Sequence, residues 1–584
     1  MILVFGKAIG LFMYLSAKKQ RVAFKNIKSA FPTKNRKEVL LILRRSFDGF
    51  GLAILEGLIY PRIHKNIEVR GDENIGLDGG IFVGIHSGNW EVAISAFAHR
   101  HKLAVFVQEQ KHKTLDKFLN EMRQEGKIKI CFSLKELIKR IKQNYFIGVV
   151  IDHGVRDDAV IVDFFSHQVP TPKGAVYLAK KFNKKLYPTF CYRKGNFSHL
   201  LEIGKPIDPK GQDDKDVLRS LNEAYEDYIT KNPWEYFWYY KRFKRKINRD
   251  VLILSDGRTG HFKQSRALLA LLSERGYVIK SEMIEMRYKS KLVRVIANIF
   301  AFFAGHNCLW CGWVLPFLID KNTWKRLNKI YADIVISTGS YVAPVNKLFS
   351  SYIGAKSAVI LRSNIPLGRF DLAIVPEHDR IQTDKAIIIK GALFDSSSLD
   401  ERRKKCKDFF NLSGKNKISL FIGGPLTDRR EFMHNLKLFI PKLKEFVAQN
   451  DQGLLVSTSR RTPQEAESYL ESELRDFKNT EALVVANKRN YDFVFEGFCV
   501  LADIIFVSNE SISMVSEVVS MQKSCVCVSL ETEDDKRKVF LESIESEVGF
   551  FNPPYKGIEL IKPKASSIFT KNKKSVKKAI GKLL

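Results

Sequence analysis

Residues 80–91 read Gly-Ile-Phe-Val-Gly-Ile-His-Ser-Gly-Asn-Trp-Glu, so an apolar run gives way at once to polar residues. The run at 80–85 has the length and apolar content of a buried strand. Trp90 and Glu91 open the segment Trp-Glu-Val-Ala-Ile-Ser-Ala-Phe-Ala, which is typical of a helix. His86 is therefore expected on a strand-to-helix turn, the place where open α/β sheets bind ligands.

Similar apolar runs alternate with helical patterns along the chain, which predicts largely parallel, buried sheets covered by helices. In the first half, a strand-like run at 146–151 lies between helical patterns at 112–124 and 173–183. Further strands are predicted at 251–254, 333–337, 358–361, 372–375, 418–422, 453–457, 503–507 and 524–529. The chain is therefore of the α/β class, with two Rossmann-like halves after a separate first domain.

The domain boundaries follow from changes in composition. A charge run at 241–246 gives way to the apolar 251–254, and the polar stretch 396–405 is either a linker or the start of a helix. A chain of 584 residues also exceeds what one core usually organises. We predict an anchor helix at 1–20 and domains at 21–247, 248–395 and 396–584. The basic amphipathic pattern at 576–584 predicts a short helix that either contacts a membrane or closes the last domain.

The formal net charge is +32, which suits nucleic acid, an anionic membrane or an acidic protein partner. Residues 1–50 carry eleven Lys or Arg against Glu38 and Asp48, beside an apolar N-terminus. This concentration favours a membrane. Since the sequence lacks zinc-finger, ribonucleoprotein and heptad-plus-basic patterns, we expect no nucleic-acid partner. A charge-driven nucleic-acid binder stays the alternative.

Residues 1–16 are apolar apart from Lys7. About 20 residues are needed to span a bilayer as a helix, and this stretch is shorter and lacks a signal-peptide cleavage site. We expect an interfacial or partly inserted anchor, with an ordinary buried helix as the alternative. The cysteines are scattered, and the lone Cys308-Leu-Trp-Cys311 pair lies among apolar residues. Structural cysteines are favoured over a zinc or redox site, so no metal is predicted.

His86 and Glu91 are the predicted catalytic pair. Within one helix they would lie about 140° apart around the axis, so His86 must be on the loop. From the first helical turn, Glu91 is expected to fold back onto one ring nitrogen while the imidazole takes a proton from an attacking hydroxyl. On spacing alone, a core or surface histidine is the alternative.

The segment at 84–91 resembles the signature of the late lipid A acyltransferases, the lauroyl and myristoyl transferase family. Further blocks at 21–32, 115–123, 152–174 and 238–244 extend the resemblance to about 20–246. It implies transfer of a fatty acyl chain from an acyl carrier protein or coenzyme A thioester to a hydroxyl of a lipid acceptor, without a cofactor. It also implies substrate-binding roles for Asn89, Trp90, Arg123 and Asp152, with Arg123 on an acceptor phosphate or the oxyanion.

The same resemblance implies where the protein works and with what. The expected partners are acyl carrier protein, a membrane glycolipid acceptor and an anionic membrane surface, at the cytoplasmic face of a bacterial inner membrane. Two departures concern the acceptor: Ser87 stands where the family usually has an aromatic residue, and Gln108-Glu109 where it usually has an arginine. The acceptor headgroup is therefore open.

In the second half, the segment 255–261 follows a predicted strand and precedes a helical run. Gly257 and Gly260 would let backbone amides and a helix N-terminus approach a phosphate or a sugar. With the segments 371–379, 422–425, 457–463 and 508–517, this stretch resembles the mitochondrial-fission ELM family over about 251–560. The resemblance implies two Rossmann-like domains of glycosyltransferase-B type, with a nucleotide-sugar donor held between them.

The predicted donor site follows the ends of strands. Gly423 and Gly424 would leave room for a diphosphate, to which serine hydroxyls and arginines would donate, and Glu517 would suit a ribose hydroxyl. The full set is Gly257, Gly260, His261, Gly423, Gly424, Ser459, Arg460, Arg461, Ser508, Glu510, Ser511, Ser513 and Glu517. An exposed charged loop is the alternative for the two arginines, and Glu377-His378-Asp379 is either catalytic or a structural turn.

Together these features predict a membrane-associated acyltransferase fused to a glycosyltransferase, acting in bacterial envelope glycolipid biosynthesis. Two steps on one lipid would gain from the high local substrate concentration that fusion provides. The alternative is an acyltransferase with a non-catalytic ELM-like module that binds or recruits.

Overall fold

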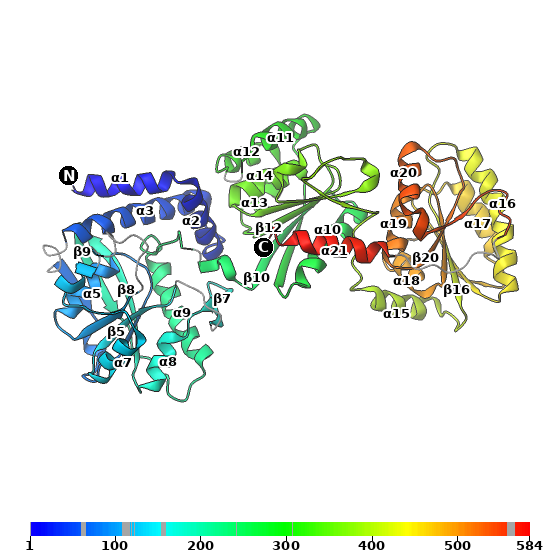
Figure 1. The fold of residues 1–584 in the computed structure, drawn as a ribbon. Helices are drawn as coiled ribbons and strands as arrows, with labels where there is room; N and C mark the ends of the chain where they lie inside the picture. Colours follow the sequence, from blue (N-terminus) through cyan, green and yellow to red (C-terminus); the bar gives the residue numbers. More distant parts are fainter. Residues whose placement is uncertain are drawn as a thin grey trace.

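The computed structural model describes residues 2–59, 66–107, 117, 120–121, 123–152, 159–240, 242–305, 308–557 and 567–583. Gln108, Glu109 and most of the predicted helix at 112–124 lie outside the described residues. Three modules follow one another in a row, each built around its own large sheet (Figure 1). The predicted α/β class is confirmed.

The first module holds a seven-stranded sheet in the order β1-β9-β8-β2-β5-β3-β4, in which all neighbours are parallel except β8 and β9. The strands are β1 (Ile67–Arg70), β2 (Ile81–Gly84), β3 (Leu103–Phe106), β4 (Lys129–Cys131), β5 (Phe146–Val150), β8 (Leu186–Gly195) and β9 (Ser198–Ile203). The hairpin β6 (Val160–Phe164) and β7 (His167–Thr171) stands apart. The helices of this module are α1 (Ile2–Leu15), α2 (Ala17–Ala30), α3 (Arg36–Leu58), α5 (Trp90–Ala98), α7 (Leu134–Lys142), α8 (Gly174–Lys181) and α9 (Asp214–Lys231).

Glycines let α1 pack directly on α3. A Cβ added at Gly51 would lie 2.1 Å from the carbonyl oxygen of Gly6, so the two backbones touch. The opposite side of α1 carries Val4, Phe5 and Phe12, which are 59–80% exposed. Among the described helices, none is long and apolar enough to cross a membrane. The membrane anchor therefore stays a prediction. Helix α1 packs on α3 with one side and exposes apolar side chains on the other.

The second module has an all-parallel sheet in the order β11-β10-β12-β13-β14-β15. Its strands are β10 (Asn248–Ser255), β11 (Val278–Glu285), β12 (Ile334–Thr338), β13 (Lys356–Ile360), β14 (Leu372–Pro376) and β15 (Ile387–Ile389). Its helices are α10 (Thr259–Ser273), α11 (Lys291–Phe303), α12 (Cys311–Leu318), α13 (Lys321–Leu327) and α14 (Ala343–Ile353).

The third module repeats this plan with the order β18-β17-β16-β19-β20-β21, the order of a doubly wound dinucleotide-binding fold. Its strands are β16 (Lys417–Ile422), β17 (Gly453–Thr458), β18 (Thr480–Val484), β19 (Ile504–Ser508), β20 (Ser524–Val528) and β21 (Gly549–Phe551). Its helices are α15 (Leu399–Phe410), α16 (Arg429–Gln449), α17 (Gln464–Leu474), α18 (Val494–Leu501), α19 (Ile512–Ser520) and α20 (Asp535–Ile544). Since α15 begins at Leu399, the polar stretch 396–405 opens a helix.

The last helix, α21 (Ile568–Ile580), leaves the third module and packs on the second (Figure 1). Its apolar side, with Val576 and Ile580, joins the core beside α10. Lys573 and Lys577 both pair with Glu274 at the end of α10. Helix α21 therefore packs on the middle module through a shared apolar core and through these two ion pairs, whereas the predicted last domain, 396–584, includes it.

Candidate active sites

The first site is built around the loop after β2, the central strand of its sheet. Asn89 caps α5, with its side-chain oxygen accepting from the backbone N–H of Val92 at 3.3 Å. Gly88 has φ +52°, and a Cβ there would lie 2.6 Å from the carbonyl oxygen of Cys191. The turn is thus fixed by a cap and by a residue that only glycine replaces without strain. It places His86 at the carboxyl end of the sheet.

Asp152 is the hydrogen-bond partner of His86. One carboxylate oxygen lies 2.8 Å from His86 Nδ1, and the other accepts from the backbone N–H of His86 at 3.0 Å. Asp152 follows β5, which neighbours β2, so the two side chains meet where parallel strands end. The predicted contact of Glu91 with a ring nitrogen is wrong, and Asp152 takes that place.

The contact between His86 and Asp152 shifts the pKa values of both side chains. Burial would raise the pKa of Asp152, but the His86 ring and backbone N–H, helped by Arg242, hold it below its usual range. Burial would lower the pKa of His86, yet the Asp152 carboxylate, with Glu91 as a further negative charge, raises it above 6.5. A carboxylate on Nδ1 selects the tautomer whose lone pair is on Nε2, which is the form that accepts a proton.

Glu91 instead binds Arg123. The Arg123 Nε donates to one Glu91 oxygen at 2.9 Å, and its Nη2 donates to the other, so the contact is bidentate. Nη1 of the same guanidinium donates to Asn120 at 3.2 Å. A planar, doubly held guanidinium beside the histidine is pre-organised for a phosphate or a developing oxyanion.

Aromatic rings pack against the His86 imidazole. The ring centroids of Trp90 and Tyr240 lie 4.8 Å and 4.6 Å from that of His86. The segment that carries Tyr240 is pinned to the loop, because the Phe237 N–H donates to the His86 carbonyl at 3.1 Å. Trp238 is fully buried, so this side chain packs in the core.

Behind the loop lies a buried charged cluster that sequence reasoning missed. Glu56 on α3 is bound by Arg193 through both guanidinium arms, by His199 Nε2 at 3.0 Å and by Asn89 Nδ2 at 3.0 Å. Burial would raise the pKa of Glu56, but the hydrogen bonds from His199 and Arg193 hold it at about 2. The Asn89 side chain is buried between the cap and Glu56, and its role in substrate binding stays a prediction. No local spacing signals this cluster, because its members come from distant strands and helices.

The third module gathers predicted residues where β16, β17 and β19 end. The Gly423 N–H donates to Ser508 Oγ at 2.8 Å, and that hydroxyl donates to Glu510 at 2.6 Å. A Cβ at Gly423 would lie 2.2 Å from Glu510, and one at Gly424 would lie 2.2 Å from the carbonyl oxygen of Arg461. The glycines therefore admit these protein groups at close range, and the predicted diphosphate site stays a prediction.

Glu510 is the unusual group of this cluster. Burial raises its pKa to about 7, and within the described part of the chain its Oε2 has no hydrogen-bond partner. Ser511 is buried next to it, and Ser459 bonds within its own turn to Thr462 and the Arg461 N–H. Arg460 and Arg461 are exposed at this edge, and their role at a donor stays a prediction.

In the second module, His261 forms a pair that resembles the first. Its Nδ1 lies 2.9 Å from Asp256 Oδ2, at the turn between β10 and α10 where Gly257 has φ +83°. A Cβ at Gly339 would lie 2.7 Å from the His261 ring, so the turn after β12 faces it closely. A histidine oriented by a buried aspartate again lies at the carboxyl end of a parallel sheet.

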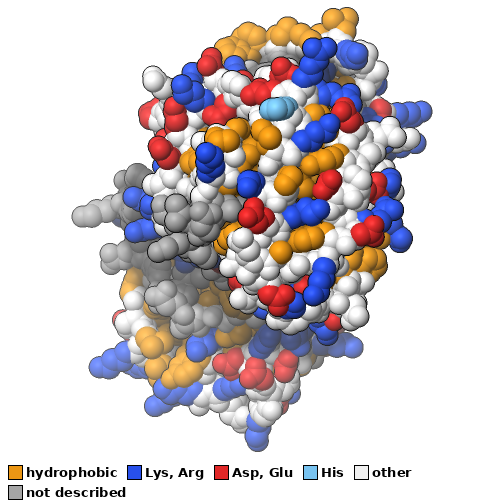
Figure 2. Space-filling model, turned by 90° about the vertical axis from the view of Figure 1, so that its right-hand side faces the viewer, with side chains coloured by type: hydrophobic (Ala, Val, Ile, Leu, Met, Phe, Trp, Pro, Cys, Tyr) orange, Lys and Arg blue, Asp and Glu red, His pale blue; other side chains and the backbone are white. Residues whose placement is uncertain are grey.

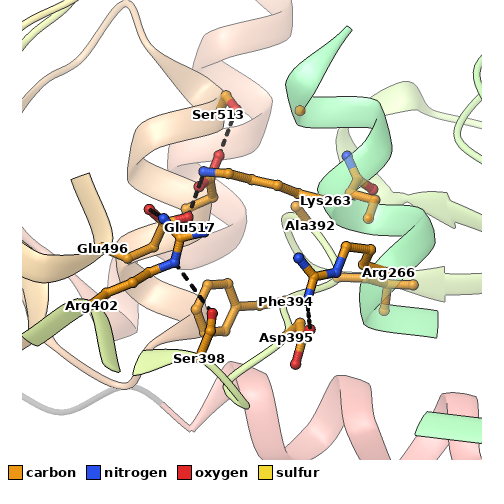
Figure 3. Close-up of a pocket in the computed structure, with 13 residues that line it drawn as sticks. Lys263, Arg266, Ala392, Phe394, Asp395, Ser398, Arg402, Glu496, Ser513 and Glu517 are labelled. Carbon is orange, nitrogen blue, oxygen red and sulfur yellow. Dashed lines mark hydrogen bonds and ion pairs between the residues drawn. The ribbon is translucent and has the colours of Figure 1, made fainter. Parts of the chain in front are cut away.

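A small pocket of about 50 Å³ lies between the second and third modules, lined by Gly260, Ser513 and Glu517 among others. Figure 3 shows Lys263 of α10 reaching across it to Glu517 of α19. The Lys263 ammonium lies 3.1 Å from Glu517 and 2.6 Å from Glu496. Glu517 is thus engaged in an ion pair between modules. His378 and Asp379 contact Phe540 and Lys536 of α20, so that segment is a structural turn between modules.

The described residues contain no group of three or more His, Cys, Asp or Glu side chains that could hold a metal ion. Cys308 and Cys311 are both buried, and Cys311 is the first residue of α12.

The chain resembles two families, one in each half. Residues 1–245 match the model described as bacterial lipid A biosynthesis acyltransferase, and residues 259–557 match the model described as mitochondrial fission ELM1. A lipid A biosynthesis acyltransferase of Haemophilus influenzae is 28% identical over 42% of this chain and 85% of its own length. A lipid A biosynthesis lauroyltransferase of Escherichia coli is 23% identical over 39% of this chain and 80% of its own length. Both predicted resemblances, and the predicted acyltransferase class, are confirmed.

Solved structures similar to this chain cover 57% of it. One is the UDP-GlcNAc 2-epimerase of Methanocaldococcus jannaschii, with 14% identity, 92% of that chain covered and a TM-score of 0.34. Another is the ADP-heptose LPS heptosyltransferase II of E. coli, with 11% identity, 98% of that chain covered and a TM-score of 0.31.

Proposed function

We propose that this chain moves a fatty acyl group onto a membrane glycolipid. The chain belongs to the mitochondrial fission ELM1 family, and its first half, which matches the lipid A acyltransferases, supports the acyl transfer. The donor is an acyl thioester of acyl carrier protein or coenzyme A, and the acceptor is a hydroxyl. The observation that carries this proposal is the His86–Asp152 pair at the carboxyl end of the central strand.

The chemistry follows from that pair. His86 Nε2 takes the proton of the acceptor hydroxyl, whose oxygen attacks the thioester carbonyl and forms a tetrahedral oxyanion. Asp152 stabilises the imidazolium that results. When the carbon–sulfur bond breaks, the imidazolium returns the proton to the leaving thiolate. Arg123, held by Glu91, binds either the oxyanion or an acceptor phosphate.

The surroundings suit a lipid and an acidic carrier. A net charge of +32 attracts an acidic carrier protein and anionic headgroups. The sequence contains no recognised nucleic-acid-binding motif. The exposed side of α1 supplies apolar contact with the bilayer. We therefore place the protein at the cytoplasmic face of a bacterial inner membrane, in envelope glycolipid biosynthesis.

The test is acyl transfer from a radiolabelled acyl thioester to extracted membrane lipids, followed by mass spectrometry. His86→Ala should lower the rate by at least 100-fold, at the low end of the roughly 10²- to 10⁴-fold that general-base help contributes. His101→Ala is the matched control, because His101 also pairs with an aspartate, Asp72, at 3.0 Å but away from this loop. Near-full activity of folded His86→Ala protein would refute the site.

A second activity is favoured by the His261–Asp256 pair. We propose that the ELM-like half transfers a sugar from a nucleotide-sugar donor to the same lipid, with His261 as the base at the acceptor hydroxyl. Release of nucleotide from a panel of sugar nucleotides, lost in His261→Ala, is the expected result. If no donor binds or turns over, the non-catalytic recruiting module replaces this proposal.

A further inference from the structure

The second module presents an apolar surface on α11 and α12 that stays open in the described structure. On α11, Leu292, Val295, Ile299 and Phe303 are 54–70% exposed and recur every three or four residues, so they share one side of the helix. The buried residues of α11 are only Ala297 and Ala301. A surface helix normally buries its large apolar side chains, and α11 does the reverse.

Helix α12 extends the same surface with Trp313, 65% exposed, and Phe317, 74% exposed. We call this surface the α11–α12 face, defined by Leu292, Val295, Ile299, Phe303, Trp313 and Phe317. A contiguous apolar surface of this kind marks a site of contact with a membrane or another molecule.

The charge around the face indicates what that contact is. No acidic residue occurs between Glu285 and Asp320 in the sequence, while Arg287, Lys289, Lys291 and Arg294 all lie there. The Lys289 ammonium lies 6.0 Å from the centroid of the Phe317 ring. A sequence segment that combines apolar side chains with cations and has no acidic residue complements an interface of acyl chains and anionic headgroups.

The face also adjoins the first module, to which α1 belongs. The Arg36 guanidinium, at the start of α3, lies 5.0 Å from the centroid of the Trp313 ring, so the α1–α3 layer adjoins α12. Figure 1 shows α1, α12 and α11 following one another along the upper side of the molecule. Figure 2, turned by 90° about the vertical axis, shows hydrophobic side chains along the upper edge with Lys and Arg beside them.

We propose that the α11–α12 face docks on an anionic phospholipid bilayer, so that the second module has a membrane contact of its own in addition to that of α1. This inference goes beyond the proposed acyl transfer, because it concerns the ELM-like half and does not require either reaction. Its consequence is that the carboxyl ends of two sheets are held at one lipid surface.

The test is co-sedimentation of the full chain with vesicles of phosphatidylethanolamine and phosphatidylglycerol, against vesicles of phosphatidylcholine. The double variant Phe303→Glu with Phe317→Glu should bind the anionic vesicles at least about tenfold more weakly, since two large apolar side chains no longer enter the interface. The matched control is Leu426→Glu with Leu438→Glu, two exposed leucines of the third module that are 51% and 43% exposed. It should bind like the wild type.

A second measurement reports the contact directly. Trp313 fluorescence should shift to shorter wavelength with anionic vesicles, and the shift should disappear in Trp313→Phe. Two results would overturn the proposal: vesicle binding of the Phe303/Phe317 double variant within twofold of wild type, or a wild-type dimer that the variant abolishes while vesicle binding is unchanged. Loss of acyl transfer with normal vesicle binding would instead count against the proposed function alone.

Discussion

At the scale of single residues, the chemistry of His86 depends on a carboxylate that follows a different strand. Its pKa is raised by Asp152 against the effect of burial, and only the neutral ring is a base. We therefore expect kcat/KM to fall as pH drops through a value above 6.5. In Asp152→Asn the attraction is lost while burial persists, so this acid limb should move to lower pH, with a rate loss of about 10⁴-fold. Rates measured from pH 5 to 9 check both, and an unmoved limb in the variant would contradict the pair.

The residues of this site could be predicted, but their partners could not. His86, Glu91, Arg123 and Asp152 were all found through short motifs. Their pairing depends on β5 lying next to β2 and on where the segment around Arg123 runs, and neither is encoded in local spacing. The Glu56 cluster gave no signal, because a buried charge is recognised only when its partners are in place.

At the scale of elements, two glycines of α3, Gly49 and Gly51, differ in how closely they approach α1. A Cβ at Gly51 would strike the backbone of α1, whereas a Cβ at Gly49 meets nothing within 4 Å. Gly51→Ala should cost about 1–3 kcal/mol of unfolding free energy as overpacking. Gly49→Ala should be neutral or stabilise by up to about 1 kcal/mol, because glycine is unfavourable inside a helix. Urea denaturation compares the two, and equal effects would show that α1 is not packed as described.

The sequence revealed central elements better than edge elements. The predicted strands at 251–254, 418–422 and 453–457 are mostly apolar runs that are buried on both faces. The edge strand β11 was missed because it alternates with polar residues and is largely exposed. The β8–β9 hairpin was missed as well, and it supplies two members of the Glu56 cluster.

At the scale of the whole molecule, the modules are joined by buried ion pairs that no sequence pattern announced. Between the first and second modules, the Lys246 ammonium lies 2.7 Å from Asp333, which also binds Lys25 at 3.3 Å and the Tyr331 hydroxyl at 2.7 Å. Lys246 is almost fully buried, so this contact fixes the relative orientation of the first two sheets. A boundary near residue 247 is predicted from composition, whereas the ion pairs across it are seen only in the tertiary structure.

The second and third modules are joined through Lys263, which predicts a pH-dependent stability. Burial raises the pKa of Glu517, and Lys263 opposes that rise. A folded state with a raised carboxyl pKa binds protons more tightly than the unfolded chain, so its stability falls as pH rises through that pKa. In Lys263→Met the opposing cation is gone and Glu496 is left beside Glu517, so the loss of stability relative to wild type should be larger at pH 8 than at pH 5.

The control for this change is Lys356→Met. Lys356 is 37% exposed, against 33% for Lys263, and it pairs with Asp371 at 2.6 Å inside one module. Asp371 keeps the hydrogen bonds from the backbone N–H and hydroxyl of Ser357, so its loss should vary much less with pH. Urea denaturation of both variants at pH 5 and pH 8 measures the loss of unfolding free energy at each pH and tests this prediction. A pH-independent effect of Lys263→Met would mean that the carboxylates across the pocket are separated in solution, and that the two modules do not meet through this ion pair.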